Sequence, residues 1–481
     1  MPVLLCLPCW LAVRCPAGFS RGHVPDEQAI SIQMVSQEAA QQPLQVTETG
    51  QTAMLEQKIH IEQLRVGIFV RLDLKWSDHP FFFSRFKIKN EEQVQILKEL
   101  GLEEITYVPA KSDCEPLPAQ PGTGTPTPSM PDESAVECER LERLRKEQIE
   151  LVRQQRQRIQ ICEKRYQETL TQVKKVMQGL SGSSKEATRD ADQLIQGLVG
   201  SITTDRETIL HVMNISTTDE TAFYHSLNVA ILSLVIAKEY GFDQDELRAL
   251  GLGALFHDIG KERIPKTIVH KRGPLSPPEQ QLMWLHPQYG AEMMATVADF
   301  PRAALQVIRQ HHETNDGKGY PDGLSGQSIS FLAKITAIAN YYDNQCNRTD
   351  PKDSLTPHES LSLMYKTRRD KFDRGLLNLF ISCLGVYPPG TIVQLNNGII
   401  ALVASINAGR PLQPNLLIYD PTVPKNEAII FDLGSQSEVK IERSLRPSQL
   451  PPKIFAYLDP RLRVSYFFDS GGTDLSAQPA V

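Results

Sequence analysis

Apolar residues recur at helical spacing through the middle of the chain. In the segment 244–256, Leu247 and Leu250 lie on one face, and Asp243 with Glu246 three residues later forms a capping pair at the start. This pattern predicts an amphipathic helix. Similar patterns recur on both sides of it, so the sequence predicts several helices that converge on one another.

Capping residues mark two of these neighbouring helices. Thr217 with Glu220 can cap a long apolar helix that holds His225. Ser276-Pro277-Pro278-Glu279 is a capping box with proline in the first turn, and we expect it to start the helix that carries His286.

Histidines fall at the ends of the predicted helices. His257-Asp258 ends the segment 244–256, and His311-His312 ends another helix predicted from Ala303 to Gln310. The chain has only 11 histidines in 481 residues, so this clustering exceeds what a fold requires. Imidazole is the commonest metal ligand, and a neighbouring carboxylate can bridge two ions. The cluster therefore predicts a metal centre inside a helix bundle.

A smaller unit with strand-like alternation is expected over residues 54–112. Residues 67–74 alternate partly as a strand does, residues 90–100 predict a short helix, and residues 105–108 predict a closing strand. We assign the aromatic run Phe81-Phe82-Phe83 to the core rather than to a ligand site.

A Pro-rich linker over residues 113–133 separates this unit from a long charged helix over residues 134–182. Apolar residues in the helix follow an interrupted 3.5-residue repeat, which favours a coiled coil. A helix that packs within its own chain is the alternative. The members of the repeat are Leu141, Val152, Ile159, Cys162, Tyr166, Val173, Val176 and Leu180.

Hairpin signals follow the helical domain, which is expected over residues 183–385. Asn396-Asn397-Gly398 and Asn407-Ala408-Gly409 separate short apolar strands. The sequence therefore predicts a small β subdomain over residues 386–455, followed by a tail over residues 456–481.

Composition and the N-terminus add little chemistry. The net charge of −6 and the absence of a basic stripe argue against a nucleic-acid polymer as partner, although not against a dinucleotide. Eight scattered cysteines are simplest to explain as reduced thiols of a cytosolic protein. The apolar run from Val3 to Val13 is too short to span a bilayer, and residues 1–53 are expected to be a disordered tail or a misassigned start.

Two motifs resemble the signatures of the HD-GYP family. They are His257-Asp258-Ile259-Gly260-Lys261 and the run from His311 to Pro321, which contains Gly319-Tyr320-Pro321. Members are bacterial metal-dependent phosphodiesterases, many of which hydrolyse cyclic di-GMP. The resemblance spans residues 200–420, and the N-terminal unit is similar to a small domain often found before HD-GYP modules. It implies a mainly α fold: an HD-type helical bundle with a small α+β N-terminal domain and a small β C-terminal subdomain.

The resemblance also implies roles for individual residues. Asp258 would bridge two ions, and the water between them would be the nucleophile. Lys261 would stabilise charge on the scissile phosphate, unless it is merely a helix-terminal lysine. Arg348 and Lys352 resemble a basic pair that contacts substrate phosphates, with solvated surface charges as the alternative. The implied metal ligands are His225, His257, Asp258, His286, His311, His312 and Asn340.

Asn340 departs from the family pattern, because it stands where the family carries an aspartate ligand. An asparagine offers only a neutral carbonyl oxygen, so we expect one ion to be held more loosely. Thr221 stands where members with three metals have glutamate, which favours a two-metal site. Nitrogen-rich ligands with one bridging carboxylate suit iron or manganese better than magnesium.

These features predict a cytoplasmic phosphodiesterase that hydrolyses cyclic di-GMP to pGpG, with GMP as a further product, and so lowers this bacterial second messenger. One alternative is a weakened HD-GYP module that acts as a cyclic di-GMP sensor or protein scaffold. Another alternative is a nucleotide phosphohydrolase of the wider His-Asp superfamily. The Gly-Tyr-Pro motif separates the two readings, because the wider superfamily lacks it. Expected partners besides cyclic di-GMP are a diguanylate cyclase or other signalling protein at the Gly-Tyr-Pro face, and a second copy through residues 134–180. Neither nucleic acid nor membrane is expected.

Overall fold

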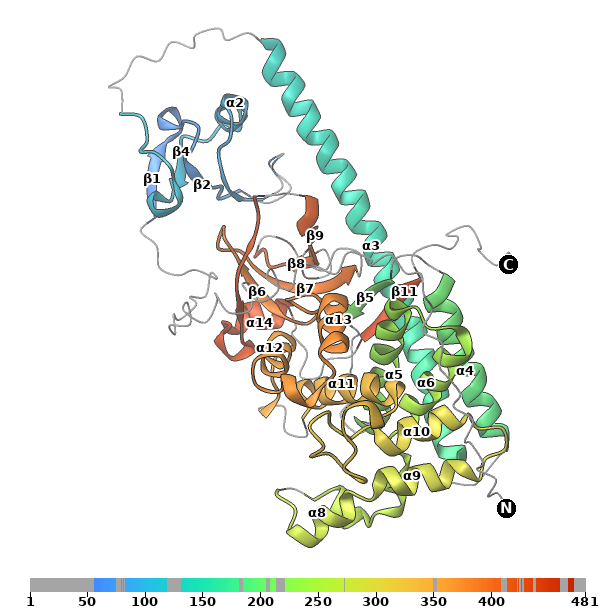
Figure 1. Cartoon of the computed structure of the whole chain (residues 1–481). Helices are drawn as coiled ribbons and strands as arrows, with labels where there is room; N and C mark the ends of the chain where they lie inside the picture. The colour runs from blue at the N-terminus through green and yellow to red at the C-terminus, as the bar shows by residue number, and fades with distance from the viewer. Residues whose placement is uncertain are drawn as a thin grey trace, which may run out of the picture.

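The helices predicted in the middle of the chain pack into one bundle, which forms the lower part of Figure 1. Its central helix is α5 (Thr221–Tyr240), whose side chains are all buried over residues 226–237. α6 (Gln244–Leu255) packs against α5 and begins at Asp243, whose side chain accepts a hydrogen bond from the backbone N–H of Glu246. The predicted capping pair is therefore confirmed.

The computed structural model describes most of the chain between residues 56 and 470. The described residues are 56–74, 79, 81, 83–118, 131–180, 185–204, 208–212, 221–271, 273–348, 353–407, 413–421, 423, 425, 428–435, 438–458 and 466–470. The predicted cap at Thr217 and Glu220 lies outside the described residues, as does most of the Pro-rich linker.

One helix boundary differs from the prediction. The capping box at Ser276 starts α8 (Pro277–Met283), but His286 is the first residue of a separate helix, α9 (His286–Ala295). Pro287 explains the break, because its ring clashes with the carbonyl four residues earlier and it has no N–H to donate. The break leaves the Met283 carbonyl free to accept a hydrogen bond from the His286 side chain.

The rest of the bundle follows the predicted order. The predicted helix that ends at the His311-His312 pair is confirmed as α10 (Arg302–Gln310). The other elements of this region are η5 (Ile259–Arg263), α7 (Lys266–Val269), α11 (Phe331–Cys346), α12 (Pro357–Thr367) and α13 (Arg374–Leu384).

The long charged helix is α3 (Pro131–Leu180), and α4 (Lys185–Thr204) runs beside its C-terminal half (Figure 1). Cys162, Tyr166 and Leu170 of α3 are fully buried in the same core as α4 and α5. This half of α3 therefore packs within its own chain, which was the alternative to a coiled coil. Leu141, Val152, Ile159 and Leu180 of the predicted repeat have side chains outside the described part.

The N-terminal unit has the predicted α+β character. Its antiparallel sheet has the strand order β1-β4-β2-β3, and α2 contributes Val94, Ile96 and Leu97 to the core beneath the sheet. The elements are β1 (Gln57–His60), β2 (Phe69–Arg71), β3 (Arg85–Lys87), α2 (Glu91–Glu99) and β4 (Glu104–Tyr107). Phe81 lies in this core, whereas Phe83 packs edge-on against Phe431 of the C-terminal sheet at 5.0 Å between ring centroids.

The C-terminal β subdomain is a seven-stranded sheet, with the order β10-β6-β7-β5-β11 and with β8 pairing with β7 and β9. The turn at Asn396-Asn397-Gly398 joins β6 to β7 as predicted, and Gly398 has the positive φ of 84° that favours glycine. The strands are β5 (Thr208–Val212), β6 (Ile392–Leu395), β7 (Ile400–Asn407), β8 (Asn415–Ile418), β9 (Ile430–Asp432), β10 (Ile441–Leu445) and β11 (Tyr466–Ser470).

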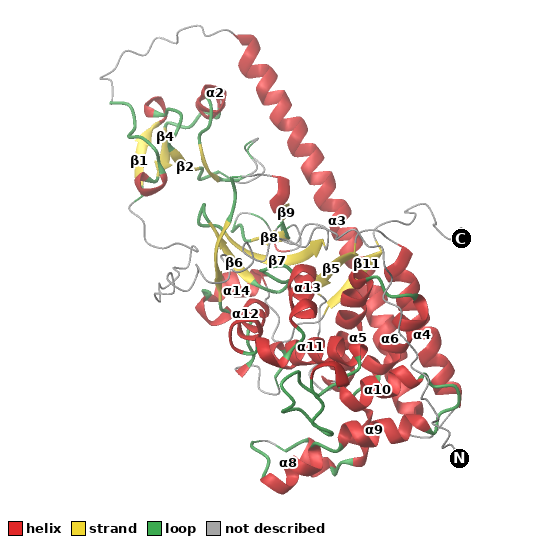
Figure 2. Cartoon of the chain, viewed as in Figure 1, coloured by secondary structure: helices red, strands yellow, loops and turns green. Residues whose placement is uncertain are grey.

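Two strands of this sheet were not predicted. β5 lies between α4 and α5, inside the segment 183–385 that was expected to be helical. β11 lies in the segment 456–481 that was expected to be a tail, as does the end of α14 (Pro452–Leu458). Figure 2 shows that helices dominate the chain and that strands are confined to the two sheets. The predicted fold class is therefore confirmed. Among the described helices, none has both the length and the apolar character needed to cross a bilayer.

Candidate metal centre

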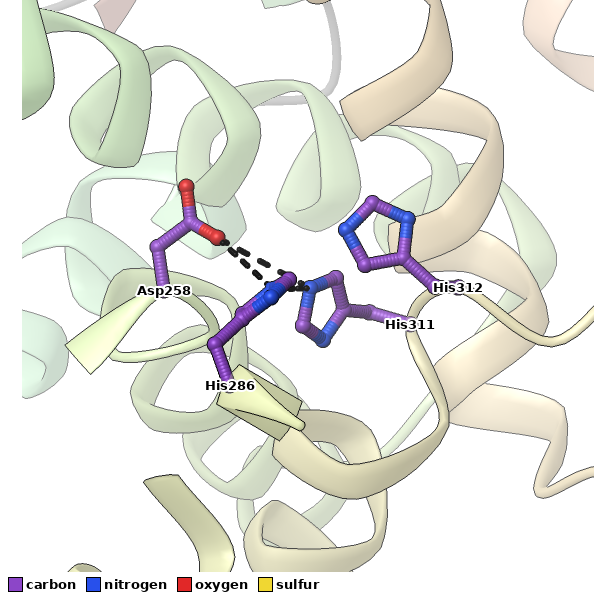
Figure 3. Close-up of side chains that lie close together, drawn as sticks. All are labelled: Asp258, His286, His311 and His312. Carbon is purple, nitrogen blue, oxygen red and sulfur yellow. Dashed lines mark hydrogen bonds and ion pairs between the residues drawn. The ribbon is translucent and has the colours of Figure 1, made fainter. Parts of the chain in front are cut away.

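The imidazoles predicted as ligands converge from four parts of the bundle. His225 comes from α5, His257 from the turn after α6, His286 from the start of α9, and His311 from the end of α10. Asp258 lies between them, and Figure 3 shows its carboxylate directed at the rings of His286 and His311.

A glycine allows the turn after α6 to lie directly against α9. A Cβ atom on Gly260 would stand 2.0 Å from the carbonyl oxygen of His286 and 2.4 Å from the backbone nitrogen of Gly290. No side chain fits in that space, so only glycine permits this approach. The Gly260 of the predicted motif thus brings Asp258 within reach of His286.

Asp258 is shared between two groups of possible ligands. Its Oδ1 lies 3.2 Å from Nε2 of His286 and 3.8 Å from Nε2 of His311. Its Oδ2 lies 3.4 Å from Nε2 of His257 and 3.7 Å from Nε2 of His225. His312 belongs to the first group, in which all ligand atoms lie within 4.8 Å of one another. The carboxylate therefore stands where a bridge between two ions would stand.

Backbone carbonyls orient three of the rings. The Nδ1 atoms of His257, His286 and His311 each lie 2.7 Å from the carbonyl oxygen of the residue three positions earlier. Because a carbonyl oxygen only accepts, each Nδ1 carries the hydrogen and each neutral ring keeps its Nε2 lone pair. All three Nε2 atoms are turned towards Asp258. This is the tautomer that a metal ligand requires.

A carboxylate performs the same task for the fourth ring. Nδ1 of His225 lies 2.6 Å from Oδ2 of Asp343, a residue that is only 1% exposed. Oδ1 of Asp343 accepts hydrogen bonds from the side-chain amides of Asn228, at 2.8 Å, and Asn347, at 2.9 Å. Asp343 therefore fixes His225 with its Nε2 facing inward, and it is not itself a member of the ligand groups.

Several inward-facing atoms of the centre lack a suitable hydrogen-bond partner among the described residues. Nε2 of His225 faces Nε2 of His257 at 3.2 Å, and Nε2 of His286 faces Nε2 of His311 at the same distance. When both Nδ1 atoms carry hydrogens, two lone pairs meet in each case. Oδ1 of Asp258 is buried and has no hydrogen-bond partner in the described part of the chain. A bound cation would accept these facing lone pairs and would pair with the buried carboxylate oxygen. The residues therefore fit metal ions.

The electrostatics keep the ligands in the required protonation states. Burial lowers the pKa of His257, His311 and His312, so these rings are neutral at pH 7. Burial acts to raise the pKa of Asp258, but Lys261 and His257 outweigh it and hold the pKa of this carboxyl well below its usual range. Three neutral imidazoles and a carboxylate are a suitable donor set for divalent ions.

Of the three predicted substrate-binding residues, only Lys261 is seen to lie at the centre. Nζ of Lys261 lies 2.6 Å from Oδ2 of Asp258, so this lysine is at the centre and not merely at a helix end. Arg348 is exposed, and its guanidinium donates to the side chain of Gln345 at 2.6 Å. Lys352 lies outside the described residues. Roles for all three towards substrate stay predictions.

Asn340 is buried on α11 but is engaged elsewhere. Its Oδ1 accepts a hydrogen bond from the side chain of Asn344 at 2.6 Å, and the residue is 3% exposed. Within the described part of the chain, no hydrogen bond or ion pair joins Asn340 to a histidine of the centre. Its role as a ligand stays a prediction.

The Gly-Tyr-Pro segment is fixed against the centre. A Cβ atom on Gly319 would stand 2.5 Å from the His312 carbonyl oxygen, so the loop passes directly over this backbone. The Tyr320 ring stacks on the His312 ring, with centroids 4.5 Å apart and planes 21° apart. The buried Glu313 carboxylate accepts from the backbone N–H groups of Asp322, at 2.7 Å, and Leu324, at 2.9 Å. Pro321 follows Tyr320 in the same loop.

Two residues that shape this centre were not predicted from the sequence. They are Asp343, which orients His225, and Glu313, which anchors the loop. A usable signal was Asn228, a polar residue inside the apolar run of α5 that needs a buried partner. No comparable local signal marks Glu313.

Two family models match this chain. A domain of unknown function, DUF3391, matches residues 56–191, and the HD domain matches residues 210–376. Cyclic di-GMP phosphodiesterase PA4108 of Pseudomonas aeruginosa is 27% identical over 75% of this chain and 84% of its own length. The response regulator RpfG of Xanthomonas campestris, also named a cyclic di-GMP phosphodiesterase, is 33% identical over 29% of this chain and 37% of its own length.

Among solved structures, the HD-GYP-type protein Bd1817 of Bdellovibrio bacteriovorus covers 68% of this chain and 98% of its own, with 20% identity and a TM-score of 0.38. The motifs at His257-Asp258 and Gly319-Tyr320-Pro321 lie inside the matched HD domain. The chain therefore carries an HD domain that follows a DUF3391 domain, and both motifs that resemble the HD-GYP signatures lie in this HD domain.

Proposed function

We propose that this chain is a metal-dependent phosphodiesterase that opens cyclic di-GMP to the linear dinucleotide pGpG, with GMP as the product of a second cut. The observation that carries the proposal is the position of Asp258, whose two carboxylate oxygens face two separate groups of imidazoles. A shared carboxylate of this kind is typical of two-metal sites that cleave phosphate esters. The names of the relatives supply the substrate.

The residues of the centre have different roles in the proposed reaction. Bound divalent ions supply Lewis acidity, which lowers the pKa of water and neutralises phosphoryl oxygens. His225 and His257 would hold one ion, while His286, His311 and His312 would hold the other. The Lys261 ammonium, 2.6 Å from the carboxylate, would turn towards the phosphate as negative charge develops there. Buried walls around the imidazoles strengthen each of these charge interactions.

Iron or manganese is the proposed metal. The donors are five imidazoles and one carboxylate, and magnesium prefers an oxygen-rich shell with several waters. Elemental analysis of the purified protein should find iron or manganese. Full turnover in a protein that contains only magnesium would contradict this assignment.

The test of the proposed function is metal content measured together with cyclic di-GMP turnover for wild type and a matched pair of histidine variants. His311→Ala removes a ligand from one group, whereas His270→Ala removes an exposed histidine at the end of α7. We expect His311→Ala to lose bound metal and turnover, and His270→Ala to keep both. Equal turnover in the two variants would show that the metal centre takes no part in the reaction.

A second candidate function is recognition of cyclic di-GMP without turnover, as a sensor or scaffold, and Asn340 favours it. The family carries a charged ligand at this position, and here the Asn340 oxygen is occupied by Asn344. The same assay separates the candidates, because a sensor binds cyclic di-GMP and leaves it intact. Location in the cytoplasm, a protein partner at the Gly-Tyr-Pro face and a homodimer through residues 134–180 stay predictions.

A further inference from the structure

Trp284 is a large aromatic side chain that stays half-exposed beside the metal centre. It is 43% exposed and directly follows α8, which projects from the bundle in Figure 1. It stands two residues before His286 in the sequence. Tryptophan usually buries most of its surface, so its exposure here calls for an occupant.

The indole continues a stack of rings that begins inside the centre. The Tyr320 ring lies on His312 with centroids 4.5 Å apart, and the Trp284 ring lies on Tyr320 with centroids 5.4 Å apart. The interplanar angles are 21° and 24°, so the three rings are nearly parallel. Tyr320 is the ring partner of Trp284 within the described part of the chain, and the remaining indole surface is available to a ligand.

We infer that Trp284 stacks on a purine base of the nucleotide substrate. This inference rests on the proposed function. The stack of His312, Tyr320 and Trp284 leads from a proposed metal ligand to the exposed indole. The proposal places a phosphate of the nucleotide at the centre and a base of the same nucleotide on the indole. A flat bicyclic base offers the largest face for a flat bicyclic side chain, and stacking of this kind is a main source of affinity in nucleotide recognition.

The experiment compares two ligands that differ only by the base. Guanosine 5′-monophosphate and ribose 5-phosphate are titrated by calorimetry into the metal-loaded full chain, for wild type, Trp284→Ala and Trp284→Phe. Tyr240→Ala is the matched control, because Tyr240 is an aromatic residue that is 53% exposed at the end of α5, where it packs against Phe242 and Phe331.

Wild type should bind the guanosine nucleotide at least about fivefold more tightly than ribose 5-phosphate, as loss of one base stack predicts. Trp284→Ala should lose this preference while its affinity for ribose 5-phosphate stays within about twofold. Trp284→Phe should keep part of the preference, and Tyr240→Ala all of it.

Three results would overturn the inference: no preference in wild type, an undiminished preference in Trp284→Ala, or an equal loss of affinity for both ligands, which indicates a structural role. Turnover of cyclic di-GMP by the same wild-type preparation is recorded separately. A Trp284-dependent preference without turnover would uphold the stacking and overturn the proposed function.

Discussion

Replacement of Asp343 by asparagine should weaken metal binding without unfolding the bundle. The substitution preserves shape, but the amide cannot satisfy all three donors that meet the carboxylate. Oδ1 of Asp343 accepts from Asn228 and Asn347, while Oδ2 faces Nδ1 of His225 at 2.6 Å. If the amide oxygen takes the Oδ1 position, the NH₂ group meets His225 and forces its hydrogen onto Nε2. If the amide is reversed, its NH₂ group meets two other NH₂ groups.

The first arrangement turns the Nε2 lone pair of His225 into a donor, which cannot bind metal. Loss of such an orienting partner typically costs about 10-fold to 100-fold in metal affinity, or about 1.4 to 2.7 kcal/mol. The second arrangement keeps the tautomer and leaves buried donors without acceptors, which costs about 1–3 kcal/mol of folding stability. Asp343→Asn should therefore lose metal affinity, stability or both.

The assay is a competition titration with a chelator of known affinity, followed by thermal unfolding of the metal-free protein. Asp370→Asn is a suitable control, because it makes the same chemical change in a side chain that is 85% exposed on η8 (Arg369–Lys371). Wild-type metal affinity together with wild-type stability in Asp343→Asn would refute the role assigned to this residue.

Three further predictions concern the centre itself. Asp258→Ala removes the shared anion, so turnover should fall by orders of magnitude while the circular dichroism spectrum is kept; near-normal turnover would exclude the two-metal mechanism. Asn340→Asp should raise metal content at a fixed metal concentration, and turnover with it if occupancy is limiting; unchanged content would remove this position from the coordination sphere. Low pH should destabilise the metal-free protein, because burial lowers the pKa of His311 and His312. Their unfolded forms bind protons below about pH 6.5 while the folded forms do not, so stability should fall below that pH by up to about 1.4 kcal/mol per unit for each histidine. Urea unfolding at pH 7.5 and 5.5 measures this, and equal stabilities would contradict it.

Local patterns in the sequence predicted most of the bundle and most of the proposed ligands. The capping pair at Asp243 and Glu246 is short-range chemistry, and so is the ending of α10 at His311. Periodicity also places the buried face of α3, although it could not decide between a partner helix and the chain's own core. Leu170, which was not a member of the predicted repeat, is buried in the core that α3 shares with α4 and α5.

The features that could not be predicted from the sequence depend on contacts between residues far apart in the chain. β11 pairs with β5 across more than half of the chain, and neither strand carries a local signal of that partner. The break before His286 was readable from Pro287, yet the capping box at Ser276 suggested one continuous helix. Asp343 acts through a ring 118 positions away, and such pairings appear only when the helices are assembled.

The central claim is that two ions share Asp258 during turnover. Metal-free protein is titrated with manganese, and bound ions per chain are measured alongside the rate of cyclic di-GMP hydrolysis at each step. Turnover should stay near zero while the first ion binds and should rise as the second site fills, reaching its maximum at two ions per chain. Full turnover with one ion per chain, or turnover that persists after complete removal of metal, would contradict the account.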